Sequence, residues 1–197
     1  MTLSNKITVS RIILIPIMIL VILLPSLKNK LIIFNLSLGE LLFAVLFVIG
    51  SLTDFLDGYL ARKRNEITTF GIFLDPVADK LLTLTAIMYI VTEKTVYNWW
   101  WTLVVVILLR EFIVMAIRTI AAKENKVIAA NIFGKIKTVI TMISIILILF
   151  NGFGLVQKLN NIGQYLLDGT FYLAVLATLI SGIIYLVENR EIVFTSK

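Results

Sequence analysis

The sequence predicts an all-α integral membrane protein, a six-transmembrane-helix bundle that forms one domain over residues 1–197. Hydrophobic residues make up 59% of the 197 residues and charged residues only 15%, which lies outside the range of ordinary soluble domains. Apolar runs of roughly transmembrane length occur six times along the chain. The three prolines fall within or beside these runs and mark no linker, so we expect no second domain.

The predicted spans follow from the apolar runs and their polar flanks. They cover residues 12–24, 41–59, 73–91, 99–120, 136–153 and 165–187. The first run is short and follows Lys6 and Arg11, a pattern that signal peptides share, but no A-x-A-like cleavage site follows it. We therefore expect a span there, preceded by a short N-terminal amphipathic juxtamembrane segment.

The distribution of basic residues predicts the orientation of the chain. With a cytoplasmic N-terminus, eleven of the 18 lysines and arginines flank spans on the cytoplasmic side, four lie outside and three fall within spans. This bias predicts cytoplasmic N- and C-termini in the cell membrane. Tyr97 and the tryptophans at 99–101 are then expected to anchor the outer interface. Loops that meet membrane lipids explain the net charge of +6, so we expect no nucleic-acid partner.

Two residue types are absent, and their absence limits the chemistry. Without cysteine there are no disulfides, thiolate metal sites or cysteine nucleophiles. Without histidine, any general base must be aspartate, glutamate, lysine or tyrosine. A bound metal must be held by oxygen atoms, which favours Mg²⁺, Mn²⁺ or Ca²⁺ over zinc.

Four aspartates interrupt the second and third apolar runs. On a helix, the second run places a set of motif residues within an arc of about 140°. This set is Asp54, Asp57, Gly58, Ala61 and Arg62. On the third run, Gly71, Asp75 and Asp79 form one stripe if the helix begins at or before Gly71. Pro76 either kinks that helix or marks its first turn with Asp75 as the N-cap.

The short connection between the two runs predicts antiparallel neighbouring helices whose carboxylates face each other near the cytoplasmic surface. Two such charges about 5 Å apart repel by about 3 kcal/mol at an effective dielectric constant of about 20. Two divalent cations would cancel four carboxylates, and paired metals are a device of phosphoryl transfer. Structural ion pairs are the alternative for the acids, and close helix packing is the alternative for the small residues.

The spacing D-x-x-D-G-x-x-A-R, eight residues, G-x-x-x-D-x-x-x-D resembles the signature of the CDP-alcohol phosphotransferases. The resemblance implies two divalent cations, Mg²⁺ or Mn²⁺, and a homodimer. It implies that the metal ligands are Asp54, Asp57, Asp75 and Asp79. It also implies that Asp79 deprotonates the acceptor alcohol. The CDP group is then expected beside Gly58, Ala61, Arg62 and Gly71.

Three further segments resemble the bacterial members of that family that make phosphatidylglycerol phosphate. N-K-I-T-V-S-R at 5–11 is similar to their nucleotide-contacting segment, which implies CDP contacts from Asn5 and Thr8. Helix capping by these two residues is the alternative. R-E-F at 110–112, Arg118 and G-K-I-K-T at 134–138 are also similar to that subgroup.

These segments imply an acceptor that carries a phosphate. Arg110 and Arg118 lie about 12 Å apart along one helix and, with Lys135 on the next, are suited to line a pocket for a small anion. Pairing of Arg110 with Glu111, and extension of the other two to the interface, are the structural alternatives.

We therefore expect transfer of the phosphatidyl group of CDP-diacylglycerol to glycerol 3-phosphate, with membrane lipids surrounding the protein. Inositol phosphate, serine or phosphatidylglycerol are alternative acceptors, because the acidic motif specifies CDP and metal rather than the alcohol. A cation transporter is the more distant alternative.

Overall fold

The computed structural model describes residues 3–28, 31–64, 69–94, 99–123, 132–159 and 161–190, and at 3–4, 54–64, 69–73 and 122–123 it describes the backbone alone. Within these residues the protein has six helices of at least 18 residues. They are α1 (Leu3–Leu23), α3 (Leu38–Arg64), α4 (Thr69–Tyr89), α5 (Trp100–Lys123), α6 (Ile132–Leu149) and α8 (Asn161–Glu188). Each contains one of the predicted apolar runs or most of it.

Short elements connect the long helices at one end of the molecule. They are α2 (Pro25–Lys28), β1 (Leu31–Ile33), β2 (Leu36–Ser37), η1 (Ile90–Lys94), η2 (Asn151–Gly154) and α7 (Leu155–Leu159). The antiparallel pair β1–β2 departs from the all-α expectation. Its two-residue turn places Phe34 at φ 55° and Asn35 at φ 58°, which is the left-handed geometry that closes a tight hairpin.

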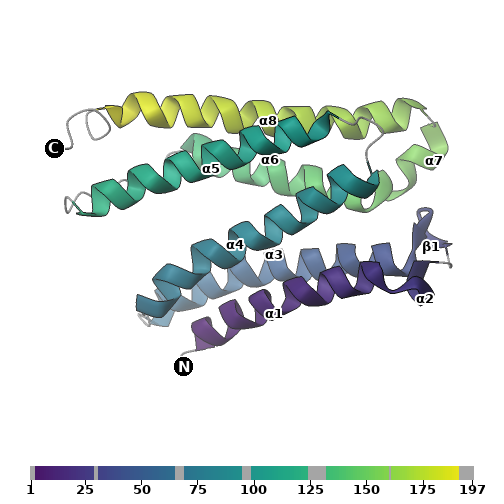
Figure 1. The fold of residues 1–197 in the computed structure, drawn as a ribbon, viewed down its shortest axis with the longest axis horizontal. Helices are drawn as coiled ribbons and strands as arrows, with labels where there is room; N and C mark the ends of the chain where they lie inside the picture. The colour runs from purple at the N-terminus through teal and green to yellow at the C-terminus, as the bar shows by residue number, and fades with distance from the viewer. Residues whose placement is uncertain are drawn as a thin grey trace.

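The six long helices form two groups of three. Figure 1 shows α1, α3 and α4 packed together on one side and α5, α6 and α8 on the other, and α3 also contacts α6. The N-terminal end of α1, the C-terminal end of α3, the N-terminal end of α4 and the C-terminal end of α8 lie at the same end of the bundle. The β hairpin and α7 lie at the opposite end. The acidic motif therefore lies at the end of the bundle where α1 begins and α8 ends.

Apolar side chains fill the centre of each group and the seam between them. Met18, Phe43 and Phe47 are at most 1% exposed between α1 and α3. In the other group Trp100 stacks on Phe171 with ring centroids 4.6 Å apart. Trp100 is 1% exposed, so its predicted role as an interfacial anchor is wrong. Helix α5 turns this indole inward, where Nε1 donates a hydrogen bond to the hydroxyl of Tyr172.

The neighbours of Trp100 point differently. Trp99 and Trp101 are exposed, as an aromatic anchor at a membrane interface requires, and Tyr97 lies outside the described residues. The indoles of this cluster thus divide between the core and the surface, because successive positions on a helix are rotated by about 100°.

The protein is an all-α membrane protein apart from this small hairpin. By length and hydropathy, three helical segments of the described chain are able to cross a bilayer: Asn5–Leu23, Ile132–Leu149 and Asn161–Glu188. Large apolar side chains on these segments are exposed on the outside of the bundle, among them Leu20, Val139 and Ile183. Such a surface suits hydrocarbon rather than water.

The predicted juxtamembrane segment before the first span is helical, but it does not lie along a membrane surface. Residues 3–12 are the first turns of α1, which continues without interruption to Leu23, and Pro16 lies inside the helix. Asn5, Thr8 and Arg11 are 7%, 0% and 1% exposed, so this polar stripe faces the interior of the bundle rather than a membrane surface. The spacing of three residues places all three side chains on one side of the helix.

Candidate functional site

The acidic motif spans the facing ends of α3 and α4. Helix α3 continues through Arg64, so Asp54 and Asp57 are both helical. Helix α4 begins at Thr69, before Gly71, which meets the condition for a single stripe of Gly71, Asp75 and Asp79. Pro76 lies inside α4, so Asp75 is not an N-cap. The prediction that these motif positions are helical, with a helix start before Gly71, is therefore confirmed.

A close approach of α3 to α4 positions these ends. A β-carbon at Gly50 would lie 2.9 Å from a methyl carbon of Leu82, so a larger residue would force the buried Leu82 side chain to move. Gly50 lies one helical turn before Asp54, and Leu82 lies about one turn after Asp79. Tight packing directly above the motif thus keeps the two acidic segments together.

Helix α1 contributes a direct contact to the motif. The hydroxyl of Thr8, which is fully buried, donates a hydrogen bond of 2.6 Å to Oδ1 of Asp75. Asn5 is buried on the same face of α1. The two residues predicted to contact CDP therefore lie on the face that meets the acidic motif, and Thr8 is bonded to a predicted metal ligand.

The described part of the motif fits a hard divalent cation. Asp75 and Asp79 are half-buried, lie one turn apart on α4 and offer carboxylate oxygens, the ligands that Mg²⁺ and Mn²⁺ prefer. Among the described side chains no group of three or more acids forms a metal cluster. The side chains of the other predicted motif residues lie outside those described: Asp54, Asp57, Gly58, Ala61, Arg62 and Gly71.

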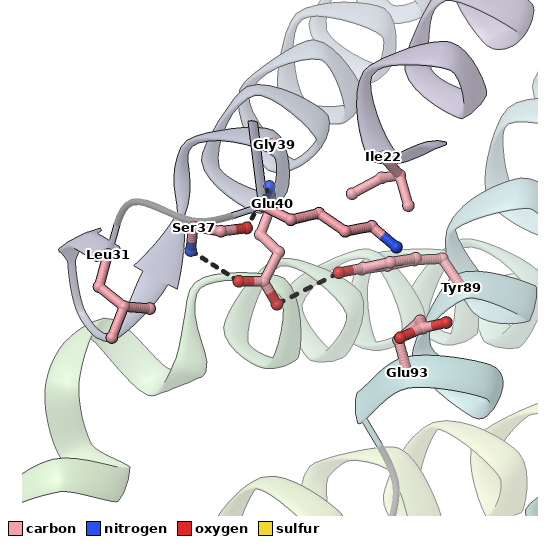
Figure 2. Close-up of a pocket in the computed structure, with 8 residues that line it drawn as sticks. Ile22, Leu31, Ser37, Gly39, Glu40, Tyr89 and Glu93 are labelled. Atoms are coloured by element: carbon pink, nitrogen blue, oxygen red, sulfur yellow. Dashed lines mark hydrogen bonds between the residues drawn. The ribbon is translucent and has the colours of Figure 1, made fainter. Parts of the chain in front are cut away.

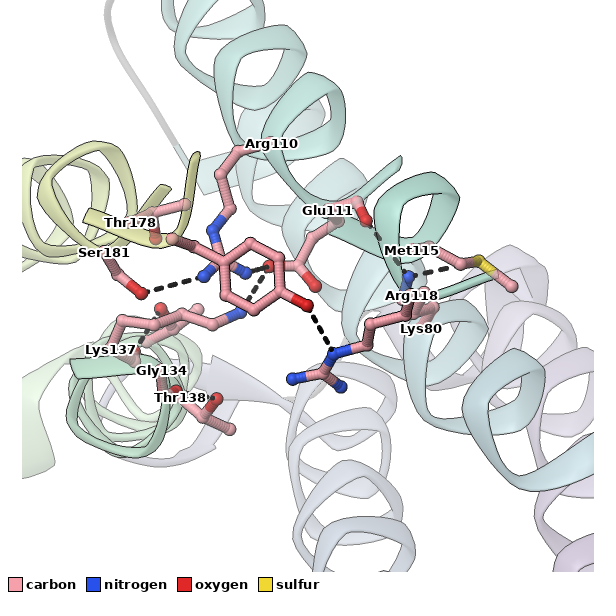
Figure 3. Close-up of polar contacts among 12 residues, drawn as sticks. Lys80, Arg110, Glu111, Met115, Arg118, Gly134, Lys137, Thr138, Thr178 and Ser181 are labelled. Carbon is pink, nitrogen blue, oxygen red and sulfur yellow. Dashed lines mark hydrogen bonds and ion pairs between the residues drawn. The ribbon is translucent and has the colours of Figure 1, made fainter. Parts of the chain in front are cut away.

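A basic cluster, made of Arg110 on α5 and Lys137 on α6, lies against α8, and Figure 3 shows both side chains directed at Glu111. Arg110 donates from Nη1 to Oε1 of Glu111 at 2.9 Å and from Nη2 to Oγ of Ser181 at 2.8 Å. Lys137 on α6 forms a second ion pair with the same Oε1. Glu111 thus joins α5 to α6, and Arg110 joins α5 to α8.

Helix α8 is shaped to admit Arg110. A β-carbon at Gly182 would lie 2.7 Å from Cγ of Arg110, so the arginine stem crosses α8 at a position without a side chain. An apolar cavity of about 280 Å³ opens beside this crossing between α5 and α8. Leu109, Ile113, Leu179 and other apolar side chains line it.

Two further cations lie beside this cluster. The ammonium of Lys80 on α4 lies 3.4 Å from the backbone oxygen of Glu111 and 3.4 Å from Sδ of Met115. Nε of Arg118 donates a 3.4 Å hydrogen bond to the hydroxyl of Tyr185, over whose ring the guanidinium lies at 5.7 Å. Arg118 is exposed and Lys80 is half-buried.

The predicted acceptor residues separate in the structure. Arg110 lies in the ion-pair network with Glu111, which is the contact that the structural alternative required. Arg118 lies on the same helix near Tyr185. Lys135 is exposed, and Lys137, two positions later, faces Glu111 instead. The sequence-based site omitted Lys80, Glu111 and Lys137. Lys135 and Lys137 lie two positions apart and so point to different sides of the helix, which means that only one of them is able to face α5.

A second pocket lies at the opposite end of the bundle. Figure 2 shows Ile22, Leu31, Gly39, Tyr89 and other residues around a cavity of about 220 Å³. On its wall the Ser37 backbone N–H donates to Glu40 Oε2 at 2.7 Å, and Lys94 pairs with Glu40 Oε1 at 2.6 Å. These contacts cap α3 and join it to η1, and they lie far from the acidic motif.

Comparisons with known proteins agree with this arrangement. The model of a family described as CDP-alcohol phosphatidyltransferase matches residues 1–185. The CDP-diacylglycerol–glycerol-3-phosphate 3-phosphatidyltransferase of Bacillus subtilis (strain 168) is 39% identical over 196 residues, 98% of each chain. Proteins of the same name from Rickettsia felis and Haemophilus influenzae are 35% identical over 185 residues and 34% identical over 181 residues. The matched parts cover 93% and 91% of this chain, and 92% and 88% of those relatives.

Proposed function

Because this chain belongs to the CDP-alcohol phosphatidyltransferase family, we propose that it transfers the phosphatidyl group of CDP-diacylglycerol to glycerol 3-phosphate. The products are phosphatidylglycerol phosphate and CMP. The chain is accordingly a membrane transferase of phospholipid biosynthesis. The observation that carries the proposal is the position of Lys80: it follows Asp79 directly on α4 and contacts α5 beside Glu111. One residue thus connects the acidic motif, suited to a metal-bound diphosphate, with a basic cluster suited to a phosphate-bearing acceptor.

The acidic motif serves the nucleotide. The proposed ligands of two divalent cations, Mg²⁺ or Mn²⁺, are Asp54, Asp57, Asp75 and Asp79. When bound, such ions neutralise charge on the diphosphate and on the departing CMP. Thr8 holds Asp75 in a fixed orientation through its hydrogen bond. The proposed CDP contacts are Asn5, Thr8, Gly58, Ala61, Arg62 and Gly71.

The transfer itself needs a base and a held acceptor. The Asp79 carboxylate accepts the proton of the acceptor hydroxyl, whose oxygen then forms a bond to the β-phosphorus. The bond from that phosphorus to the CMP oxygen breaks, and CMP leaves with the electron pair. Basic side chains hold the acceptor phosphate, and the residues proposed for this from the sequence are Arg110, Arg118 and Lys135.

We also propose six spans, formed by α1, α3, α4, α5, α6 and α8. The acidic motif, the N-terminal end of α1 and the C-terminal end of α8 lie at the same end of the bundle. This arrangement supports cytoplasmic termini and a cytoplasmic active site in the plasma membrane. A water-soluble acceptor reaches the site from that side, and the lipid donor enters from the bilayer. A homodimer is the proposed oligomer.

The test is an acceptor assay with purified protein in detergent micelles. CDP-diacylglycerol and Mg²⁺ are supplied with glycerol 3-phosphate, inositol phosphate, serine or phosphatidylglycerol in turn, and CMP release is measured. Glycerol 3-phosphate should give the highest rate, and chelation of divalent cations should abolish it. Release with another alcohol but none with glycerol 3-phosphate would overturn the proposed acceptor. Full activity after removal of Mg²⁺ and Mn²⁺ would contradict the metal assignment.

A further inference from the structure

Lys80 is a cation of the described chain to which the proposed mechanism gives no chemical task. It follows Asp79 on α4, and its side chain extends across to α5. Its ammonium lies 3.4 Å from a backbone oxygen, which is long for a hydrogen bond to oxygen, and 3.4 Å from the Met115 sulfur, which is only a weak acceptor. The Phe112 ring lies 6.0 Å away. These contacts hold the side chain in place, and none of them is to a carboxylate.

Lys80 differs from Arg110 and Lys137 in its pairing. Lys137 forms an ion pair with Glu111, and Arg110 shares the same carboxylate. At the far end of the bundle Lys94 pairs with Glu40. Among the described side chains, Lys80 and Arg118 have no carboxylate within ion-pair distance. Glu111 already pairs with Arg110 and Lys137, so Lys80 and Arg118 remain available to bind another anion.

The electrostatic surroundings of Lys80 connect both halves of the site. Among the described side chains, Glu111, Lys137, Asp79 and Arg118 carry charges near enough to act on its ammonium. Lys80 is therefore within electrostatic reach of the proposed base on one side and of the basic cluster on the other. A half-buried ammonium at membrane depth is costly when no paired carboxylate neutralises it, and such residues usually serve a ligand.

We propose that Lys80 binds the phosphate group of the acceptor together with Arg118, so that the acceptor hydroxyl lies at Asp79. In this arrangement Glu111 is a positioning residue, because it engages Arg110 and Lys137 and leaves the phosphate to the other two cations. The inference rests on the proposed function and assigns the phosphate-binding residues within it. It gives Lys80 a substrate contact and makes the site selective for phosphate monoesters.

The first test removes the charge of Lys80 in the full-length protein. With K80Q, the KM for glycerol 3-phosphate should rise at least about tenfold, which corresponds to loss of one charge-assisted hydrogen bond. The KM for CDP-diacylglycerol should remain unchanged, and inorganic phosphate should become a correspondingly weaker competitor of glycerol 3-phosphate. K80R, which keeps the charge, should restore most of the acceptor affinity. Lys158→Gln on α7, at the other end of the bundle, is the matched control and should match the unsubstituted protein.

A second test leaves Lys80 in place and gives it an internal counter-ion. Met115 is 37% exposed and its sulfur lies beside the ammonium, so M115E places a carboxylate within reach of Lys80. M115E should raise the KM for glycerol 3-phosphate, whereas the neutral M115Q should not. This pair decides the matter if K80Q does not fold.

The outcomes separate this inference from the proposed function. If the unsubstituted protein releases no CMP with glycerol 3-phosphate, the proposed function fails. If it does release CMP but K80Q folds with an unchanged acceptor KM and phosphate inhibition, the role of Lys80 is overturned and the function stands. A K80Q protein that changes only the Mg²⁺ requirement also overturns that role, because Lys80 then serves the acidic motif. Equal KM values for M115E and M115Q would likewise overturn it.

Discussion

Thr8 donates a 2.6 Å hydrogen bond to Asp75 across the interface of α1 and α4. The two residues lie 67 positions apart, and Thr8 is fully buried. A hydroxyl that donates to one carboxylate oxygen fixes the direction of the other, so Thr8 is placed to orient a metal ligand.

Thr8→Val should therefore weaken metal binding. Valine has nearly the shape of threonine but lacks the donor, so the Mg²⁺ concentration for half-maximal activity should rise by about tenfold. Thr8→Ser keeps the hydroxyl and serves as the control. Titration of activity with Mg²⁺ at saturating substrates measures the effect. A rise in the KM for CDP-diacylglycerol at saturating Mg²⁺ would instead support the nucleotide contact predicted for Thr8.

Asp79→Asn should separate binding from turnover. The amide oxygen remains able to face a cation, but the group no longer accepts a proton at neutral pH, so kcat should fall by at least about 100-fold. The KM for CDP-diacylglycerol should change little. Steady-state CMP release with varied donor concentration measures both quantities. Parallel losses in donor binding and turnover would show that Asp79 acts as a ligand alone.

Lys135 and Lys137 form a natural matched pair. Lys137→Met leaves Glu111 with one cation fewer and should lower the free energy of unfolding by about 1 to 3 kcal/mol. Lys135→Met removes an exposed charge and should change it by less than about 0.5 kcal/mol. Thermal unfolding in micelles provides the comparison. Acceptor kinetics of Lys135→Met test its proposed phosphate contact separately, because a raised KM without lost stability would support that contact.

The Glu40–Lys94 ion pair predicts a pH-dependent stability. Glu40 lies in the first turn of α3, before the predicted span at 41–59. Burial raises the pKa of its carboxyl, but the Lys94 ammonium and the Ser37 backbone N–H together lower that pKa by more than burial raises it. The pKa therefore lies below the ordinary value of 4.5. A pKa that is lower in the folded protein than in the unfolded chain contributes stability above the unfolded value. That contribution disappears as the pH falls through the folded pKa.

The unfolding temperature of the protein should therefore fall as the pH drops below the ordinary glutamate value of 4.5, and Glu40→Gln should reduce that fall. The comparison requires thermal unfolding of both proteins at several pH values in the same detergent. Glu93→Gln, at the same end of the bundle, is the matched control. An identical pH dependence for Glu40→Gln and the unsubstituted protein would exclude Glu40 as its source.

The acidic motif illustrates how far local patterns reach. The spacing of Gly71, Asp75 and Asp79 predicted one helical stripe, and α4 contains all three positions. The spacing required only that the helix begin early enough, a property of the local chain. The same reasoning failed for the segment before the first span, because a polar stripe predicts an amphipathic helix but not whether water or protein covers it.

The basic cluster shows what local patterns leave open. The sequence pattern predicted Arg110, Arg118 and Lys135 for this cluster. In the structure Lys137 pairs with Glu111, and Lys80 on α4 contacts the backbone of the same residue. Choosing between two lysines about 200° apart on a helix requires the rotation of that helix about its axis. Packing with other helices sets that rotation, as where Gly182 admits the stem of Arg110.

By itself, the sequence determined the membrane class, the positions of the long helices and the faces on which the acids lie, because hydropathy and the helical period are local properties. Only the tertiary structure decided that Thr8 bonds to Asp75, that Glu111 engages Arg110 and Lys137, and that Lys80 has no carboxylate within ion-pair distance among the described side chains. The physical reason is that ion pairs between helices depend on the distances and rotations set by packing, which no periodicity along one segment encodes.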